Sequence, residues 1–205
     1  MLTIGITGGT GSGKTTILNQ IKEKFNEKDI GFISQDSYYN DNGDLSFEEK
    51  NKINFDHPDA VDFELMINHL IDLKNGVNIN QPIYSFFDHN RTEKTKTIES
   101  KKIMIVEGIL ILNNKKLRDL IDIKVFIESS VDLRFKRRLN RDISERGRSE
   151  EEVIELFNNR LNEMHKLYVE PMKKFCDIII TNNKKKIIEI NPLIKIINKN
   201  LYNEN

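Results

Sequence analysis

Apolar residues along the chain form short runs, separated by stretches in which they recur with helical spacing. Runs of strand length lie at residues 2–6, 30–34, 103–106, 125–127 and 178–180. Between them, apolar positions recur every three or four residues, most clearly over 15–25 and 62–73. This alternation indicates an α/β fold: an open, mostly parallel sheet flanked by helices. Ligands of such sheets bind beyond the carboxyl ends of the strands.

The remaining segments add smaller elements to this sheet. An extended segment at 79–86 and an alternating one at 95–99 predict a small β-hairpin insertion, over about 79–99. Residues 40–60 are polar and turn-rich, and a long helix is predicted from 149 to about 167. No repeat or linker divides the 205 residues, so we expect a single domain spanning 1–205.

One stretch carries a specific chemical signal. Gly8 to Thr15 fits the phosphate-loop pattern G-x-x-x-x-G-K-S/T, between a predicted strand and a predicted helix. Glycines let backbone N–H groups approach phosphates closely, and the helix N-terminus adds donors and partial positive charge. The residues predicted to bind nucleotide phosphates are Gly8, Gly9, Thr10, Gly11, Ser12, Gly13, Lys14, Thr15 and Thr16. Lys14 is suited to the β- and γ-phosphates, and the Thr15 hydroxyl to Mg²⁺.

Two carboxylates follow predicted strands and are candidates for chemistry at that loop. Glu107 ends an apolar strand, where an acidic group suits Mg²⁺; the alternative is a capping or turn glutamate. Asp36 follows the second strand and is the candidate general base for an attacking hydroxyl, with an Asx-turn aspartate as the alternative. Position alone leaves the two roles of Asp36 equally supported.

Basic residues gather in the segment from about 134 to 149. They include Arg138, Arg141, Arg146 and Arg148, and Gly147 provides a candidate hinge. Arginine matches phosphate oxygens bidentately, so this segment is predicted to be an arginine-rich lid over the transferred phosphoryl group. The alternative is a solvated basic helix face, which is the commoner reason for a run of like charges.

Aromatic side chains and an imidazole lie together on the extended segment. Tyr84, Phe86 and His89 could stack on and read a planar base. Buried aromatic residues beside a surface histidine are the alternative, and the residues alone favour it.

Composition narrows the function classes. The net charge is zero, with 32 basic and 32 acidic residues, which weakens a nucleic-acid-binding interpretation. The single cysteine, Cys176, excludes an internal disulfide and a multi-cysteine metal site. No apolar run approaches ~18 residues and no signal peptide is visible, so we expect a cytoplasmic protein without membrane partners.

Several segments, in order, resemble the uridine kinase (uridine–cytidine kinase) family over about residues 3–181. They are Gly8 to Thr16, Gln35 to Tyr39, Asn54 to Ala60 with Asp62, Pro82 to Phe86 with His89 and Arg91, Glu107 to Leu110, and Arg141 to Arg148. The resemblance implies transfer of the γ-phosphoryl group of ATP or GTP, with Mg²⁺, to the 5′-hydroxyl of uridine or cytidine in pyrimidine salvage. It also implies a homo-oligomer, commonly a homotetramer, regulated by pyrimidine triphosphates.

The same resemblance assigns roles to individual residues. Asp36 matches the catalytic base, and Lys14 and Arg146 complete the predicted catalytic set. Asp56 and Arg138 match ribose contacts, while Tyr39, Tyr84, Phe86 and His89 match the pocket around the base. Arg141, Arg146 and Arg148 match lid positions near the phosphates, and Glu107 matches the acid on the magnesium side.

The chain departs from the family on the helix after the lid. Leu156-Phe157 stands where Gln-Tyr is usual, and Asn162-Glu163-Met164 where Arg-Pro-Met often follows. The usual glutamine contacts the ribose, so the acceptor is less firmly predicted than phosphoryl transfer. The competing hypotheses are a P-loop kinase of another alcohol, such as pantothenate or ribulose phosphate, and a P-loop switch protein.

Overall fold

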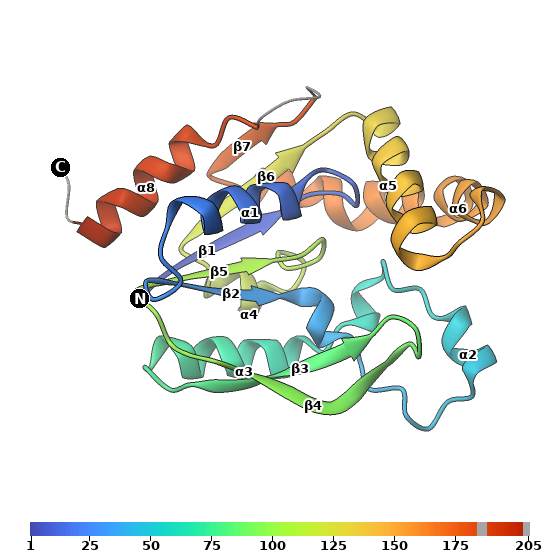
Figure 1. The fold of residues 1–205 in the computed structure, drawn as a ribbon, viewed down its shortest axis with the longest axis horizontal. Coiled ribbons are helices and arrows are strands. Elements are labelled where there is room, and N and C mark those ends of the chain that lie inside the picture. Colours follow the sequence, from blue (N-terminus) through green and yellow to red (C-terminus); the bar gives the residue numbers. More distant parts are fainter. Residues whose placement is uncertain (184–187, 203–205) are drawn as a thin grey trace.

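A five-stranded parallel sheet is the centre of the computed structural model, which describes residues 1–183 and 188–202 (Figure 1). The side chains of Asn51 and Arg146 also lie outside the described part. The strands are β1 (Leu2–Thr7), β2 (Ile30–Ser34), β5 (Ile103–Glu107), β6 (Ile123–Glu128) and β7 (Ile178–Thr181), in the order β2-β5-β1-β6-β7. Each neighbouring pair is parallel, which confirms the predicted fold class.

Both faces of the sheet are buried, which explains why its strands read as continuous apolar runs. On one face, Ile4 and Ile6 of β1 contact the cluster of α1 (Lys14–Lys24) and α8 (Asn191–Tyr202). On the other, Met104 and Val106 of β5 join the cluster that includes α3 (Phe63–Lys74) and α4 (Lys115–Asp119). Figure 1 shows α1 and α8 together on one side and α3 on the other.

The predicted hairpin is present and forms a second, two-stranded sheet. Strands β3 (Ile79–Ser85) and β4 (Asn90–Ile98) pair antiparallel, with an irregularity between Pro82 and Tyr84. The second strand begins five residues before the segment that the alternation indicated. Most of β4 is exposed, so residues 90–94 carry no apolar alternation that could have marked them.

The polar stretch 40–60 contains a helix that the sequence analysis left out. Helix α2 (Phe47–Lys52) begins at a capping box: the Ser46 hydroxyl accepts from Glu49 N, and the Glu49 carboxylate accepts from Ser46 N at 2.9 Å. A 3₁₀ turn, Pro58–Ala60, follows before α3. A six-residue helix is too short for its apolar period to show, so only the capping residues could have indicated it.

The predicted lid segment is mostly one helix. Helix α5 (Val131–Arg146) ends at Gly147, which adopts a left-handed conformation with φ of 65°. Helix α6 (Glu150–Leu156) then runs into π-helical segments at Phe157–Leu161 and His165–Val169, joined by α7 (Asn162–Met164) and followed by a 3₁₀ helix, Glu170–Phe175. The single long helix predicted from 149 is therefore wound unevenly. In the described part of the chain, no helix is long and apolar enough to cross a bilayer.

Candidate active site

The phosphate loop joins β1 to α1 at the carboxyl edge of the sheet, as the sequence predicted. Gly8 and Gly13 have φ of 145° and 103°, which residues with a side chain rarely adopt. A Cβ at Gly8 would lie 2.4 Å from Ile127 O, and one at Gly13 would lie 2.3 Å from Asn182 Nδ2. Backbone conformation and close packing therefore both require glycine at these positions.

Lys14 is the first residue of α1 and is folded back onto the loop. Its Nζ donates to Gly8 O at 2.9 Å and to Gly9 O at 3.3 Å. Burial lowers the pKa of Lys14, and the carboxylates of Glu107 and Asp36 oppose that shift. The ammonium therefore stands over the loop with replaceable carbonyl partners, which is the position needed to contact a phosphate.

Glu107 ends β5, next to β2 and β1 in the sheet. Ser34 Oγ donates to its Oε1 at 2.5 Å. Burial and the nearby Asp36 raise the pKa of Glu107, while Lys14 and Ser34 counter the shift. Together with the Thr15 hydroxyl, these oxygen groups match the hard ligands that Mg²⁺ prefers. Among the described residues no group of three or more acidic, histidine or cysteine side chains is placed to hold a metal ion, so nucleotide and water oxygens would supply the remaining ligands.

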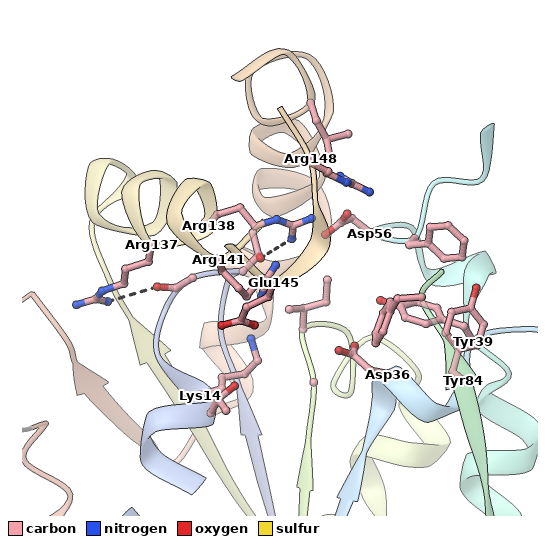
Figure 2. A pocket seen from close by; sticks show the side chains of 18 of the residues that line it. Lys14, Asp36, Tyr39, Asp56, Tyr84, Arg137, Arg138, Arg141, Glu145 and Arg148 are labelled. Carbon is pink, nitrogen blue, oxygen red and sulfur yellow. Dashed lines mark hydrogen bonds between the residues drawn. The ribbon is translucent and has the colours of Figure 1, made fainter. Parts of the chain in front are cut away.

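Asp36 lies in a short 3₁₀ helix, Gln35–Tyr38, directly after β2. The buried Gln35 before it fixes this turn, because its Oε1 accepts from Leu110 N at 2.7 Å. Asp36 itself is half-buried and lines the same cavity as Lys14 and Glu107. Figure 2 shows Lys14 and Asp36 facing this cavity from two different elements.

The lid arginines converge on Asp142, a residue that the sequence analysis did not single out. Arg138 Nε donates to Asp142 Oδ2 at 2.5 Å, and Arg141 donates to Oδ1 at 2.9 and 3.0 Å. Arg148 Nη1 lies 3.9 Å from Oδ2, and the Asp142 side chain is fully buried. A single carboxylate therefore organises arginines from both sides of the turn at Gly147. The predicted catalytic residue Arg146 ends α5, but its side chain lies outside the described part.

The arginines do not all face the same part of the cavity. Arg138, which was predicted to contact the ribose, lies instead at the phosphate end of the cavity in this structure. Its Nη1 donates to Thr10 Oγ1 of the phosphate loop at 2.7 Å. Arg148, predicted near the phosphates, points toward Asp56 in Figure 2, and its charge reaches His89. Both side chains line the cavity.

The predicted base pocket is an aromatic cluster built from several segments. The ring centroids of Tyr39 and Tyr84 lie 5.2 Å apart, and those of Tyr84 and Phe86 lie 5.5 Å apart. The His89 ring stacks on Phe55 at 5.3 Å with an interplanar angle of 18°. The structure thus brings together all four residues predicted around the base, although they come from a turn and a hairpin that are far apart in sequence.

Two members of this pocket were missed. Phe55 contacts Tyr39 at 5.2 Å between centroids, and Phe47 of α2 lies 6.3 Å from His89; both line the cavity. Phe55 lies directly before Asp56, in the segment from Asn54 to Ala60 that carries the family resemblance, so the sequence contained a signal for it. The sequence contained no such signal for Phe47, because Phe47 enters the pocket only through helix α2, which was not predicted.

An ion pair ties the hairpin to the rest of the pocket. Arg91 of β4 donates through Nε to Tyr39 O at 2.8 Å and through Nη2 to Asp62 Oδ2 at 3.0 Å. Asp62 also caps α3 by accepting from Leu65 N. The hairpin and the Tyr39 turn therefore hold one relative position.

The Tyr84 hydroxyl is buried in the aromatic cluster without a hydrogen-bond partner among the described residues, and burial raises its pKa.

One continuous cavity of about 1040 Å³ joins the phosphate loop to the aromatic cluster. Lys14, Thr15 and Glu107 line one end; Tyr39, Phe55 and His89 line the other. Pockets for a single small ligand are typically ~300–1,000 Å³, so this volume is at the upper limit for one ligand and can hold two adjacent ones. Leu156 and Arg160 also line it.

Comparison with models of known protein families gives a match over most of the chain. The model of the phosphoribulokinase / uridine kinase family matches residues 3–189. The chain belongs to this family. Within the family, it is 48% identical to a uridine kinase of Clostridium perfringens over 191 residues, which cover 93% of this chain and 92% of that protein. It is 45% identical to a uridine kinase of Clostridium novyi over 202 residues, or 98% and 97% of the two chains.

Solved structures of kinases share the fold. The phosphoribulokinase of Rhodobacter spheroides has a TM-score of 0.65 at 16% identity, over 88% of this chain and 69% of that one. The D-glycerate 3-kinase of Cryptococcus neoformans has a TM-score of 0.66 at 18% identity, over 92% and 88%. At these identities the likeness shows the fold alone.

Proposed function

We propose that the protein is a uridine kinase that transfers the γ-phosphoryl group of ATP or GTP to the 5′-hydroxyl of uridine, and also of cytidine. The observation that carries this proposal is the single cavity, with a phosphate loop at one end and an aromatic, imidazole-containing pocket at the other. The high identity to clostridial uridine kinases over nearly the whole chain supports the choice of acceptor.

The end of the cavity lined by Tyr39, Phe55 and His89, here called the acceptor end because it would hold the nucleoside that accepts the phosphoryl group, suits a pyrimidine base. Rings of Tyr39, Phe55 and Phe86 supply flat apolar surface, and the His89 imidazole supplies hydrogen-bonding groups. Burial and the charge of Arg148 lower the pKa of His89, so its imidazole is neutral at pH 7 and presents both a donor and an acceptor. Asp56 lies between this pocket and the lid, where it would hold the ribose hydroxyls (Figure 2).

Asp36 is the proposed general base. As the 5′-oxygen bonds to the γ-phosphorus, its proton passes to the Asp36 carboxylate, and the bond from the γ-phosphorus to the β–γ bridging oxygen breaks. That bridging oxygen leaves with its electron pair on the nucleoside diphosphate. The position of Asp36 at the cavity wall, across from Lys14, supports this role.

The phosphate-loop end of the cavity, here called the donor end, would hold the nucleoside triphosphate that donates the phosphoryl group. Cationic groups at this end stabilise the negative charge of the phosphates during transfer. Lys14 would exchange the Gly8 and Gly9 carbonyls for phosphate oxygens, and Arg141 would exchange Asp142. Thr15 and Glu107 would hold Mg²⁺, which neutralises phosphate charge when it is bound with the nucleotide. Because these groups already stand at the cavity, little reorganisation is needed when the nucleotide binds.

A comparison of acceptors tests the proposal. Formation of ADP from MgATP is measured with uridine, cytidine, 2′-deoxyuridine, adenosine, pantothenate and ribulose 5-phosphate, each at several concentrations. We expect uridine and cytidine to give the highest kcat/KM. A higher kcat/KM for pantothenate or ribulose 5-phosphate would overturn the proposed acceptor, and ADP formation that no alcohol accelerates would indicate a nucleotide-hydrolysing switch instead.

A further inference from the structure

Two arginines of α5, three residues apart, contact the phosphate loop in different ways. Arg137 Nη1 donates to Gly11 O at 3.3 Å and to Ser129 Oγ at 3.1 Å. Arg134, by contrast, is only 2% exposed, and its Nε and Nη1 have no hydrogen-bond partner within residues 1–183 and 188–202. Buried guanidinium nitrogens without partners are costly, so Arg134 calls for an explanation that Arg137 does not.

Arg134 packs directly against the loop. A Cβ built on Gly9 would lie 2.9 Å from Arg134 Nη1, and one built on Gly11 would lie 2.4 Å from Arg134 O. The guanidinium is not among the groups that line the cavity, whereas Lys14 and Thr15 are. Thr10 and Gly11, which follow Gly9, do line the cavity, so the loop backbone lies between the Arg134 charge and the space in which phosphates would bind.

No close anion compensates this charge among the described residues. Glu170 is the carboxylate whose field favours the charged form, but its Oε2 lies 3.2 Å from His165 Nε2 and its side chain is 53% exposed. His165 supplies no negative charge either: burial and the Arg134 charge lower its pKa to about 4, so its imidazole stays neutral. A guanidinium stays protonated in proteins, so the protein holds a buried positive charge behind the loop.

We propose that Arg134 is kept behind the phosphate loop to attract the donor's phosphates through the backbone at Gly9, at the expense of stability in the nucleotide-free protein. Burying a charge without a partner destabilises a fold, and an anion a few ångströms away recovers that loss because screening is weak there. Arg134 thus acts as a positioning and field-generating residue. This inference rests on the proposed nucleoside triphosphate donor.

The variant Arg134→Met tests the idea, since methionine replaces the charge with an apolar chain that suits a buried site. Thermal unfolding of the nucleotide-free protein and calorimetric titration with MgATP are measured. We expect the melting temperature to rise by about 2–4 °C, as about 1 kcal/mol gives in a chain of this size. We expect the Kd for MgATP to increase about tenfold or more, the increase for AMP to be smaller, and the Kd for uridine to stay unchanged.

Two variants serve as controls. Arg137→Met removes an arginine that is hydrogen-bonded to the same loop, so it should lower the melting temperature of the nucleotide-free protein. Arg134→Lys keeps the charge and should retain most of the MgATP affinity. Opposite signs of the thermal shift for Arg134→Met and Arg137→Met would separate a field effect from ordinary structural support.

A lower melting temperature for Arg134→Met, failure of that variant to fold, or an unchanged Kd for MgATP would each overturn the inference. Nucleotide binding is measured directly, so these outcomes do not depend on which alcohol accepts the phosphoryl group. If uridine proves not to be the acceptor while MgATP binding responds to Arg134 as described, the proposed acceptor fails and the inference stands.

Discussion

The two ends of the cavity are built by different physical means. At the donor end, charged groups are already bonded within the protein: Lys14 to loop carbonyls, and Arg138 and Arg141 to Asp142. At the acceptor end, aromatic rings from separate segments contact one another, with centroid distances of 5.2 Å for Tyr39 and Tyr84 and 5.3 Å for Phe55 and His89. The hydroxyl of Tyr84 is left unpartnered in the described structure.

This difference separates two kinds of effect. A phosphate must replace existing partners at the donor end, so changes there should act on charge developing in the transition state and lower kcat. The acceptor end is filled by stacking and a few hydrogen bonds, so changes there should alter KM and selectivity.

Lys14→Ala should reduce phosphoryl transfer by orders of magnitude while the protein stays folded, because it removes the charged side chain within the loop. Turnover is measured alongside far-ultraviolet circular dichroism, with the exposed Lys24→Ala on the same helix as the matched control. Near-normal turnover of a folded Lys14→Ala protein would refute the assignment of the donor end.

Asp36→Asn should keep ATP and uridine binding but lose most of kcat. Loss of a general base typically costs ~10²- to 10⁴-fold. Single-turnover rates and separate binding titrations make the distinction. If kcat is unchanged and only the KM for uridine rises, Asp36 is a binding residue and belongs to the acceptor end.

Asp142→Asn should loosen the donor end more than the acceptor end, which it reaches only through Arg148. Removing one partner of a buried ion pair costs about 3–5 kcal/mol, so thermal stability should fall. Because Arg138 and Arg141 lose their common anchor, kcat should fall more than uridine affinity. Asp132→Asn, an exposed charge in the first turn of the same helix, is the control and should change little. Equal losses in both variants would mean that Asp142 has no organising role.

The acceptor end should respond to mild acid through His89. Burial and Arg148 lower its pKa below the ordinary value of ~6.5, so its imidazole is still mostly neutral at a pH where a free histidine is already half protonated. As pH falls further, protonation adds a charge facing Arg148, and the KM for uridine should rise. In His89→Asn the KM should be higher at pH 7.5 but should lose most of this pH dependence. The same acid response in both proteins would assign it to another group.

The smallest effect concerns Leu156, which lines the cavity where the resembling family has a ribose-binding glutamine. One missing hydrogen bond of ~1 kcal/mol should weaken the preference for uridine over 2′-deoxyuridine by roughly 5- to 10-fold, and Leu156→Gln should restore it. Arg160 lines the same cavity and could replace the glutamine, whereas Asn159 does not line it. A selectivity ratio that does not move in Leu156→Gln, but collapses in Arg160→Ala, would assign the ribose contact to Arg160.

The donor end was largely predictable because its information is local. The loop from Gly8 to Thr15 is one contiguous segment, and its glycines are fixed by their own backbone conformation and close packing. The strands were predictable for a similar reason: burial on both faces leaves continuous apolar runs such as 103–106.

The rest depends on contacts between distant segments. In the sequence, nothing distinguishes Asp142 from an ordinary helix carboxylate. Its contacts with Arg138, Arg141 and Arg148 form only in the folded protein. Phe47 reads as an isolated aromatic until α2 carries it to His89. The role proposed for Arg134 depends on its packing behind Gly9, which no spacing along the chain reveals.

The most direct test is transfer of label from γ-³²P-ATP with Mg²⁺ to uridine. The products are separated, and the hydroxyl that carries the phosphoryl group is identified. We expect labelled uridine 5′-monophosphate to form with wild-type protein and to be nearly absent with Asp36→Asn, and we expect 5′-deoxyuridine to accept no label. Label that appears only in inorganic phosphate, or in a product phosphorylated at another hydroxyl, would contradict the proposed function.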